Sequence, residues 1–100
     1  MTVTREELAG KIDLTDWFAL RAHLERGGVI VVDNLLDLVE VAVAVAGDDV
    51  KRIEEWVSKG LVGKPSAQEI EQWDAEQGKE FLCLIVSPFV LVQETLPTSG

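Results

Sequence analysis

The chain has 100 residues, which is enough for a single domain and excludes a two-domain enzyme with a cleft between lobes. Hydrophobic residues make up 47% and charged residues 27%, so the chain is too apolar to be disordered and too interrupted by charge for a membrane protein. Its formal net charge of -9 argues against binding to nucleic acid or to anionic membranes, since both attract basic proteins.

The N-terminal sequence and the cysteine count predict a cytoplasmic protein. Glu6 and Glu7 stand where a secretory signal peptide would carry its basic region, and no apolar stretch follows them. The longest acid-free apolar run, Val41–Ala46, is far shorter than the roughly 20 residues that span a bilayer. Cys83 is the only cysteine, which excludes an intramolecular disulfide and favours a reducing compartment.

The first third of the chain predicts two helices and a strand. Thr4 and Glu7 have the spacing of a capping box, which predicts a short N-terminal helix. Apolar residues then recur at helical spacing through the stretch 16–25, and the Gly27-Gly28 pair ends this second helix. Val29–Val32 is a run of β-branched residues, which predicts a short buried strand.

The segment Asn34–Gly47 is compatible with a strand or a helix. Its valines alternate with other residues, as in a strand, but a strand would then be apolar on both faces. A helical period instead gathers Asp37 and Glu40 in one narrow polar stripe, with apolar side chains around the rest of the circumference. We therefore prefer a nearly buried helix.

Capping signals predict two further helices. Asp49 can cap a helix over Val50–Lys59, which Gly60 ends. After a connector at residues 61–65, Ser66 and Glu69 form a second capping box that opens a helix to about residue 77.

The C-terminal part contains two strand-like runs, Phe81–Val86 and Phe89–Gln93. Pro88 lies between them and has no amide donor for a ladder, so it marks either a turn between antiparallel strands or a bulge on an edge strand. Residues 95–100 are small and polar, and we expect a flexible tail there after a single domain over residues 1–94.

Together these signals predict an α+β fold, with about five helices packed on a small, mainly antiparallel sheet of about three strands. The three tryptophans, Trp17, Trp56 and Trp73, are expected to anchor the core or its edge. The expected helices cover residues 4–10, 16–25, 34–46, 50–59 and 66–77, and the expected strands cover 29–32, 81–86 and 89–93.

Several short motifs follow one another in a fixed order between residues 5 and 94. They are Gly28-Val-Ile-Val-Val-Asp33, Leu36-Asp-Leu-Val-Glu-Val-Ala42, Asp48-Asp49, Trp56 with Gly60-Leu61, Lys64-Pro65-Ser66, Trp73 and Val86-Ser-Pro-Phe-Val-Leu-Val-Gln93. In these motifs the chain resembles a bacterial family known as domain of unknown function 2288. The resemblance implies a small stand-alone bacterial protein in the cytosol, and it brings no activity, cofactor or catalytic residue.

No residue is predicted to be catalytic and no cofactor is expected. His23 is the only histidine, whereas a metal site built from histidine and cysteine needs several such ligands. Cys83 lies within an apolar run, where burial would raise the pKa of its thiol. Phosphate-binding glycine loops, nucleotide fingerprints and serine elbows are missing from the sequence, which therefore favours a protein without catalytic activity.

Three carboxylates form the one candidate metal site. Asp33, Asp37 and Glu40 are spaced four and three apart, so on a continuous helix they would lie on one side and could hold Mg²⁺ or Ca²⁺. The alternative is that they form the solvated stripe of an otherwise buried helix, with Asp33 near its N-terminus. The sequence favours the solvated stripe because it contains no calcium-loop pattern.

The successive helices at 34–46 and 50–59 also suggest a helix-turn-helix regulator. Their charges oppose it, since the first contains no basic residue and the stretch 48–59 has more acids than bases. We expect no nucleic-acid partner.

The leading functional hypothesis is a non-catalytic, self-associating or protein-binding module, because a small sheet leaves open edges and the strands at 81–86 and 89–92 carry almost no charge to block pairing. The alternative is a carboxylate-based divalent-cation or small-ligand binding protein.

The acidic excess lies in Gly27–Val50 and Pro65–Gly78, which contain no basic residue. If these two stretches adjoin in the fold, the expected partner is a basic protein or a cation.

Overall fold

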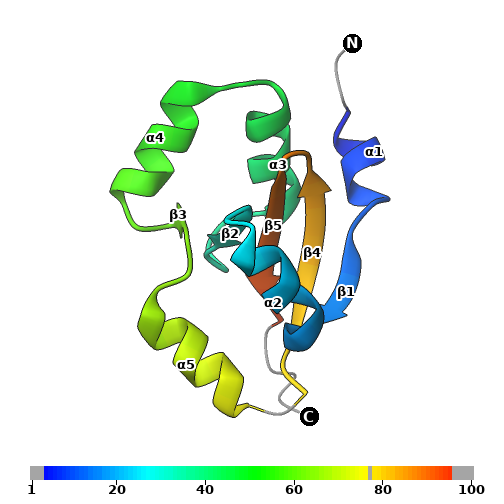
Figure 1. The fold of residues 1–100 in the computed structure, drawn as a ribbon. Coiled ribbons are helices and arrows are strands. Elements are labelled where there is room, and N and C mark those ends of the chain that lie inside the picture. Colours follow the sequence, from blue (N-terminus) through cyan, green and yellow to red (C-terminus); the bar gives the residue numbers. More distant parts are fainter. Residues whose placement is uncertain (1–3, 77, 96–100) are drawn as a thin grey trace.

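A mixed sheet with helices on both faces organises the part of the chain that the computed structural model describes, residues 4–76 and 78–95 (Figure 1). Within these residues the strand order is β1-β4-β5-β2-β3. The strands are β1 (Asp13–Asp16), β2 (Val29–Val32), β3 (Val62–Gly63), β4 (Glu80–Val86) and β5 (Phe89–Glu94). The helices are α1 (Arg5–Ala9), α2 (Trp17–Glu25), α3 (Leu38–Ala46), α4 (Val50–Ser58) and α5 (Ala67–Ala75). The predicted tail at 96–100 lies outside the described residues.

Side-chain caps determine where the helices begin. At each N-cap, a side-chain oxygen accepts a hydrogen bond from a backbone N–H of the first turn, which would otherwise lack a partner. The capping box of Ser66 and Glu69 forms as predicted. Gly27 and Gly60 follow α2 and α4 with φ of 77° and 74°, a left-handed conformation that glycine adopts without a steric penalty. The N-caps are Thr4, Asp16, Asp37, Asp49 and Ser66.

The described sheet has five strands, two more than the sequence predicted. The additional strand β1 is short and leads directly into α2, because Asp16 is both its last residue and the N-cap of the helix. The additional strand β3 has only two residues and lies in the segment 61–65 expected as a connector. Three pairings are antiparallel, as expected, but β2 and β5 are parallel, so the sheet is mixed. Ser87 and Pro88 form the turn between β4 and β5.

The ambiguous segment forms a helix, as preferred, but the helix begins later than expected. Asp37 is the N-cap of α3, and the backbone from 34 to 36 forms turns. Asp33 therefore precedes the helix, outside its first turn. Near this turn, Gln93 of β5 is buried and its amide donates hydrogen bonds to the backbone oxygens of Asp33 and Leu36.

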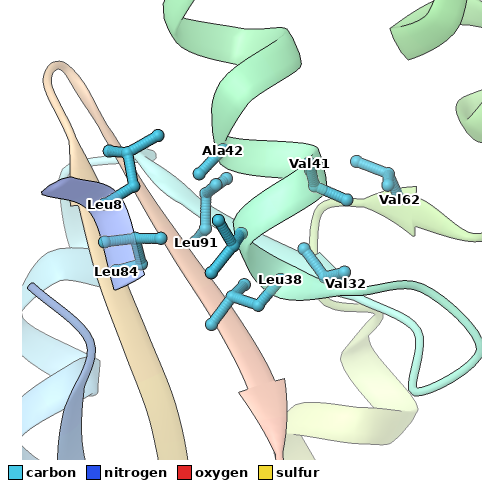
Figure 2. Close-up of a cluster of buried hydrophobic side chains, with 9 residues drawn as sticks. Leu8, Val32, Leu38, Val41, Ala42, Val62, Leu84 and Leu91 are labelled. Atoms are coloured by element: carbon cyan, nitrogen blue, oxygen red, sulfur yellow. The ribbon is translucent and has the colours of Figure 1, made fainter. Parts of the chain in front are cut away.

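Both faces of the sheet carry an apolar cluster, which explains why the inner strands are apolar at nearly every position. On one face, here called the α3 face, side chains from α1, α3 and the strands meet (Figure 2). Figure 2 shows the apolar side of α3 directed at the strands, with Leu8 of α1 over Leu84. The buried members of this cluster are Leu8, Val32, Leu38, Val39, Val41, Ala42, Val62, Leu84 and Leu91.

The opposite face, here called the α5 face, is covered by α2 and α5 and has an aromatic centre. The rings of Trp17 and Trp73 lie 5.1 Å apart, and Trp73 contacts Phe81 edge to face at 4.9 Å. These two tryptophans are buried, as predicted. Trp56 is half-buried at the border of the other cluster, where the guanidinium of Arg52 lies 5.0 Å from its ring.

A carboxylate of β5 joins the aromatic centre to the residue before β4. One oxygen of Glu94 lies 2.9 Å from Lys79 Nζ and 3.3 Å from Trp73 Nε1. The hydrogen bond from Lys79 to Glu94 raises the pKa of the lysine above its ordinary value of 10.5. The ammonium form is therefore more favourable in the folded chain than in the unfolded chain.

We expect the free energy of unfolding to fall as the pH rises above about 10.5, because the stabilisation from Lys79 is lost when the lysine deprotonates through its raised pKa. Replacing Lys79 by glutamine should lower stability at neutral pH and flatten this alkaline decline. Urea midpoints between about pH 9 and pH 11.5 measure it, with the exposed Lys11→Gln as control. An equally steep decline in both variants would contradict this role of Lys79.

Candidate functional site

Helix α4 has a strongly amphipathic sequence and yet buries none of its residues fully. Val50, Ile53, Trp56 and Val57 lie on one side of the helix at 100° per residue. Val50 and Val57 nevertheless keep 52% and 51% of their surface exposed. The apolar face of α4 therefore extends beyond the core that it contacts.

An apolar cavity of about 320 Å³ lies under this face, between α4, the end of α3 and the sheet. Exposed Val57 and Phe89 are at its border, and Asp48 supplies the charged side chain of its lining. Asp48 lies in the turn between α3 and α4, with a φ of 57°. We call this space the apolar cavity; it is lined by Ile30, Val45, Asp48, Ile53, Val57, Val62, Gly63, Phe89 and Leu91.

A second space of about 250 Å³ lies on the α5 face of the same sheet edge. Asp33, Lys64 and Glu69 give it a polar lining. We call it the polar hollow; it is lined by Val31, Asp33, Gly60, Leu61, Val62, Gly63, Lys64 and Glu69. The apolar cavity and the polar hollow thus share the two residues of β3.

The two acidic stretches meet at the polar hollow, since Asp33 belongs to the first and Glu69 to the second. Asp33 Oδ1 accepts a hydrogen bond from the backbone of Leu35, and Glu69 Oε1 accepts one from the backbone of Ser66. Both carboxylates are held by the local backbone. The two acidic stretches therefore adjoin in the fold at this point. Their adjoining is the condition on which the expectation of a basic or cationic partner depends.

The three carboxylates of the candidate metal site are not on one helix face. Asp37 caps α3 and pairs with Arg5 at 2.9 Å, whereas Glu40 pairs with Arg52. Asp33 precedes the helix and borders the polar hollow. Among residues 4–76 and 78–95, no three histidine, cysteine, aspartate or glutamate side chains are grouped so that they could hold a metal ion.

We expect about 10 mM MgCl₂ or CaCl₂ to leave the melting temperature where NaCl of equal ionic strength leaves it, because a ligand stabilises a fold only by binding it. Differential scanning fluorimetry measures the shift. A rise that disappears in the triple variant Asp33→Asn, Asp37→Asn, Glu40→Gln would contradict this expectation and support the cation-binding alternative.

His23 and Cys83 have the surroundings of structural residues. His23 is half-buried in the last turn of α2. Cys83 is half-buried in β4, where burial and, secondarily, the nearby charge of Asp13 raise the pKa of its thiol. A raised pKa keeps the thiol protonated and weakly nucleophilic at neutral pH.

Helices α3 and α4 follow one another in the chain, as the helix-turn-helix hypothesis requires. In α4 Arg52 pairs with Glu40 of α3, and Lys59, the C-cap of the helix, pairs with Glu55. Each of these two bases faces an acid of its own chain, which reduces the positive charge that the helix offers to phosphates. The absence of a nucleic-acid partner stays a prediction.

Comparison with known proteins places the chain in a family. The family described as "Protein of unknown function (DUF2288)" matches residues 3–94. The chain belongs to this DUF2288 family. The DUF2288 chain also matches the solution NMR structure of PA1075 from Pseudomonas aeruginosa, with a TM-score of 0.80 and 31% sequence identity over 93% of this chain and 85% of that one.

No curated protein matches the DUF2288 chain. Within its described residues, the helices are too short or too polar to cross a membrane. The family resemblance seen in the sequence is confirmed, while the apolar cavity and the polar hollow were not anticipated from the sequence. The amphipathic pattern of α4 is visible in the sequence, but the exposure of its valines and the cavity beneath them are seen only in the fold.

Proposed function

We propose that this DUF2288 chain is a small, non-catalytic, cytoplasmic interaction module that binds an apolar side chain of a basic protein partner in the apolar cavity. The observation that carries the proposal is the open apolar cavity beneath α4, at whose border Val57 and Phe89 stay 51% and 40% exposed. Exposed apolar residues gathered around a groove mark interaction sites, whereas single exposed apolar residues do not. A cytoplasmic setting agrees with a single cysteine, which cannot form an intramolecular disulfide.

The dimensions of the cavity suit a protein anchor. A volume of about 320 Å³ accommodates a leucine or a phenylalanine side chain with space for its rim contacts. Burying apolar surface contributes about 25 cal/mol for each Å² removed from water. Anchors of this kind, placed in a preformed pocket, supply much of the binding energy in protein interfaces.

A distinct partner fits better than a second copy joined through open strands. β4 and β5 are interior strands, so the uncharged edge on which the expectation of self-association rested is reduced to Leu84–Val86, where β4 continues beyond its pairing with β1. Of the described edge strands, β1 carries Asp13 and Asp16, and β3 is followed by Lys64 and Pro65. Charge, short length and proline all block strand pairing between copies. Two copies at a net charge of -9 also repel each other.

Selection from a displayed peptide library tests this proposal. Binders are selected on the immobilised chain and compared on two variants, Val57→Lys and Ser58→Lys, which add the same charge to α4. Val57 borders the cavity, whereas Ser58 is exposed 100° further around the helix and lies outside the cavity lining. Lysine near a helix C-terminus is favourable, so both variants should fold.

We expect enriched peptides with an apolar anchor that lose binding to Val57→Lys and keep it on Ser58→Lys. Enrichment that is equal on both variants, or no enrichment, would overturn the proposal. Light scattering during size-exclusion chromatography tests the other occupant: a dimer that Val57→Lys dissociates would replace the distinct partner by a second copy.

A further inference from the structure

The apolar cavity and the polar hollow lie on opposite faces of one short edge strand. β3 is the last strand of the described sheet and runs between α4 and α5 (Figure 1). Val62 is opposite Val32, whose side chain is on the α3 face, and Gly63 is opposite Val31, on the α5 face. A chain lying along β3 would therefore have the cavity on one side and the hollow on the other.

Within the described residues, one residue of β3 turns its backbone polar groups away from the sheet. Asp33 N–H donates to Leu61 C=O at 2.8 Å, so a hydrogen bond joins this opposed pair. Because bonded and non-bonded pairs alternate in an antiparallel ladder, the next pair, Val32 and Val62, turns its N–H and C=O groups away from each other. The N–H and C=O of Val62 thus point away from β2.

Gly63 leaves space beside this backbone. A Cβ added at Gly63 would meet no atom of residues 4–76 or 78–95 within 4 Å. Pro65, two residues further on, has no N–H to offer and limits the length of any added strand. The edge is thus suited to a segment of a few residues and unsuited to extension of the sheet by a second copy.

We propose that the partner is a short extended segment lying along β3, with an apolar side chain in the apolar cavity and a basic side chain next to it in the polar hollow. This proposal rests on the proposed function. Adjacent side chains of an extended segment point to opposite sides, which matches spaces on opposite faces of one strand. Peptides that add to sheet edges take affinity from backbone pairing and specificity from such alternating pockets.

The charge of the hollow favours the basic side chain. Asp33 and Glu69 line it with two carboxylates against the single ammonium of Lys64. Both carboxylates accept hydrogen bonds from backbone N–H groups, which hold them at the hollow. The net charge of -9 adds a general attraction for a basic segment.

Two synthetic peptides with the same composition test this inference. In KLKVKLK apolar and basic residues alternate, whereas KKKKLVL gathers them in blocks. We expect isothermal titration calorimetry to show binding of the alternating peptide about tenfold or more tighter than the block peptide. Equal affinities, or no binding of either, would overturn the alternating pattern; a Val57-dependent peptide from the library selection would still support the proposed function.

Three variants test the polar hollow beside β3. Asp33→Asn with Glu69→Gln keeps the acceptors of both backbone hydrogen bonds while removing the charge of the hollow, and should weaken the alternating peptide about tenfold. Glu6→Gln with Glu25→Gln removes the same charge from exposed sites on α1 and α2 and should change affinity far less. Gly63→Val introduces a side chain into open space beside the hollow, so it should fold and lose binding. Equal loss in the two charge variants would overturn the role of the hollow.

Discussion

Replacing Phe81 by alanine should lower the free energy of unfolding by about 3–5 kcal/mol. Phe81 has no exposed surface, and the rings of Trp73 and Trp17 lie 4.9 and 6.0 Å from its own. Its loss leaves a space at the centre of the α5 face that the two larger rings cannot fill without leaving their own contacts. A domain of this size has only about 5–15 kcal/mol of stability, so the variant should be close to unfolding.

Urea denaturation followed by far-ultraviolet circular dichroism measures this loss independently of tryptophan fluorescence, which the substitution itself would change. Phe18→Ala is the matched control, because Phe18 is 73% exposed on α2 and should cost less than about 0.5 kcal/mol. A loss at Phe81 no larger than at Phe18 would contradict the aromatic centre as the anchor of this face.

Gln93→Glu should lower the free energy of unfolding by about 2–3 kcal/mol at neutral pH, less than Phe81→Ala. Gln93 is 8% exposed, and its Nε2 donates to the backbone oxygens of Asp33 at 3.0 Å and Leu36 at 2.7 Å. A carboxylate has nearly the same shape but no N–H to donate, so it would place negative charge against two carbonyl oxygens. The turn that carries Asp33 to the polar hollow would lose its attachment to β5.

The pH dependence of Gln93→Glu separates this cause from a simple packing defect. Burial and the facing oxygens raise the pKa of the introduced carboxyl in the folded state, so its deficit should shrink as the pH falls and it becomes protonated. Chemical denaturation between about pH 4 and pH 8 follows the deficit, with the exposed Gln68→Glu as control. A deficit that is constant over this range would contradict the donor role of Gln93.

The helices could be predicted from the sequence because their signals are local. Thr4, Asp49 and Ser66 cap the first turns that follow them, and Gly27 and Gly60 follow the helix ends. The strands β1 and β3 could not be predicted in the same way. Each is short, and each exists because a distant strand, β4 or β2, offers it hydrogen bonds.

The difference between local signals and long-range contacts also explains which parts of the candidate site could be predicted from the sequence. The charge placement indicated an acidic surface around Asp33, and the structure brings Glu69 to the same polar hollow. The metal hypothesis required one continuous helix from Asp33 to Glu40, but Asp37 begins the helix as its N-cap. The apolar cavity depends on how α4 packs against the sheet, which no local pattern specifies.

A ¹⁵N–¹H NMR titration of the chain with the alternating peptide tests the proposed docking site most directly. We predict saturable shift changes concentrated at Val57 and Phe89 around the apolar cavity and at Val62 and Gly63 along β3. Changes centred on Phe18, the exposed aromatic side chain of α2, or the absence of any saturable change, would contradict binding at this edge of the sheet.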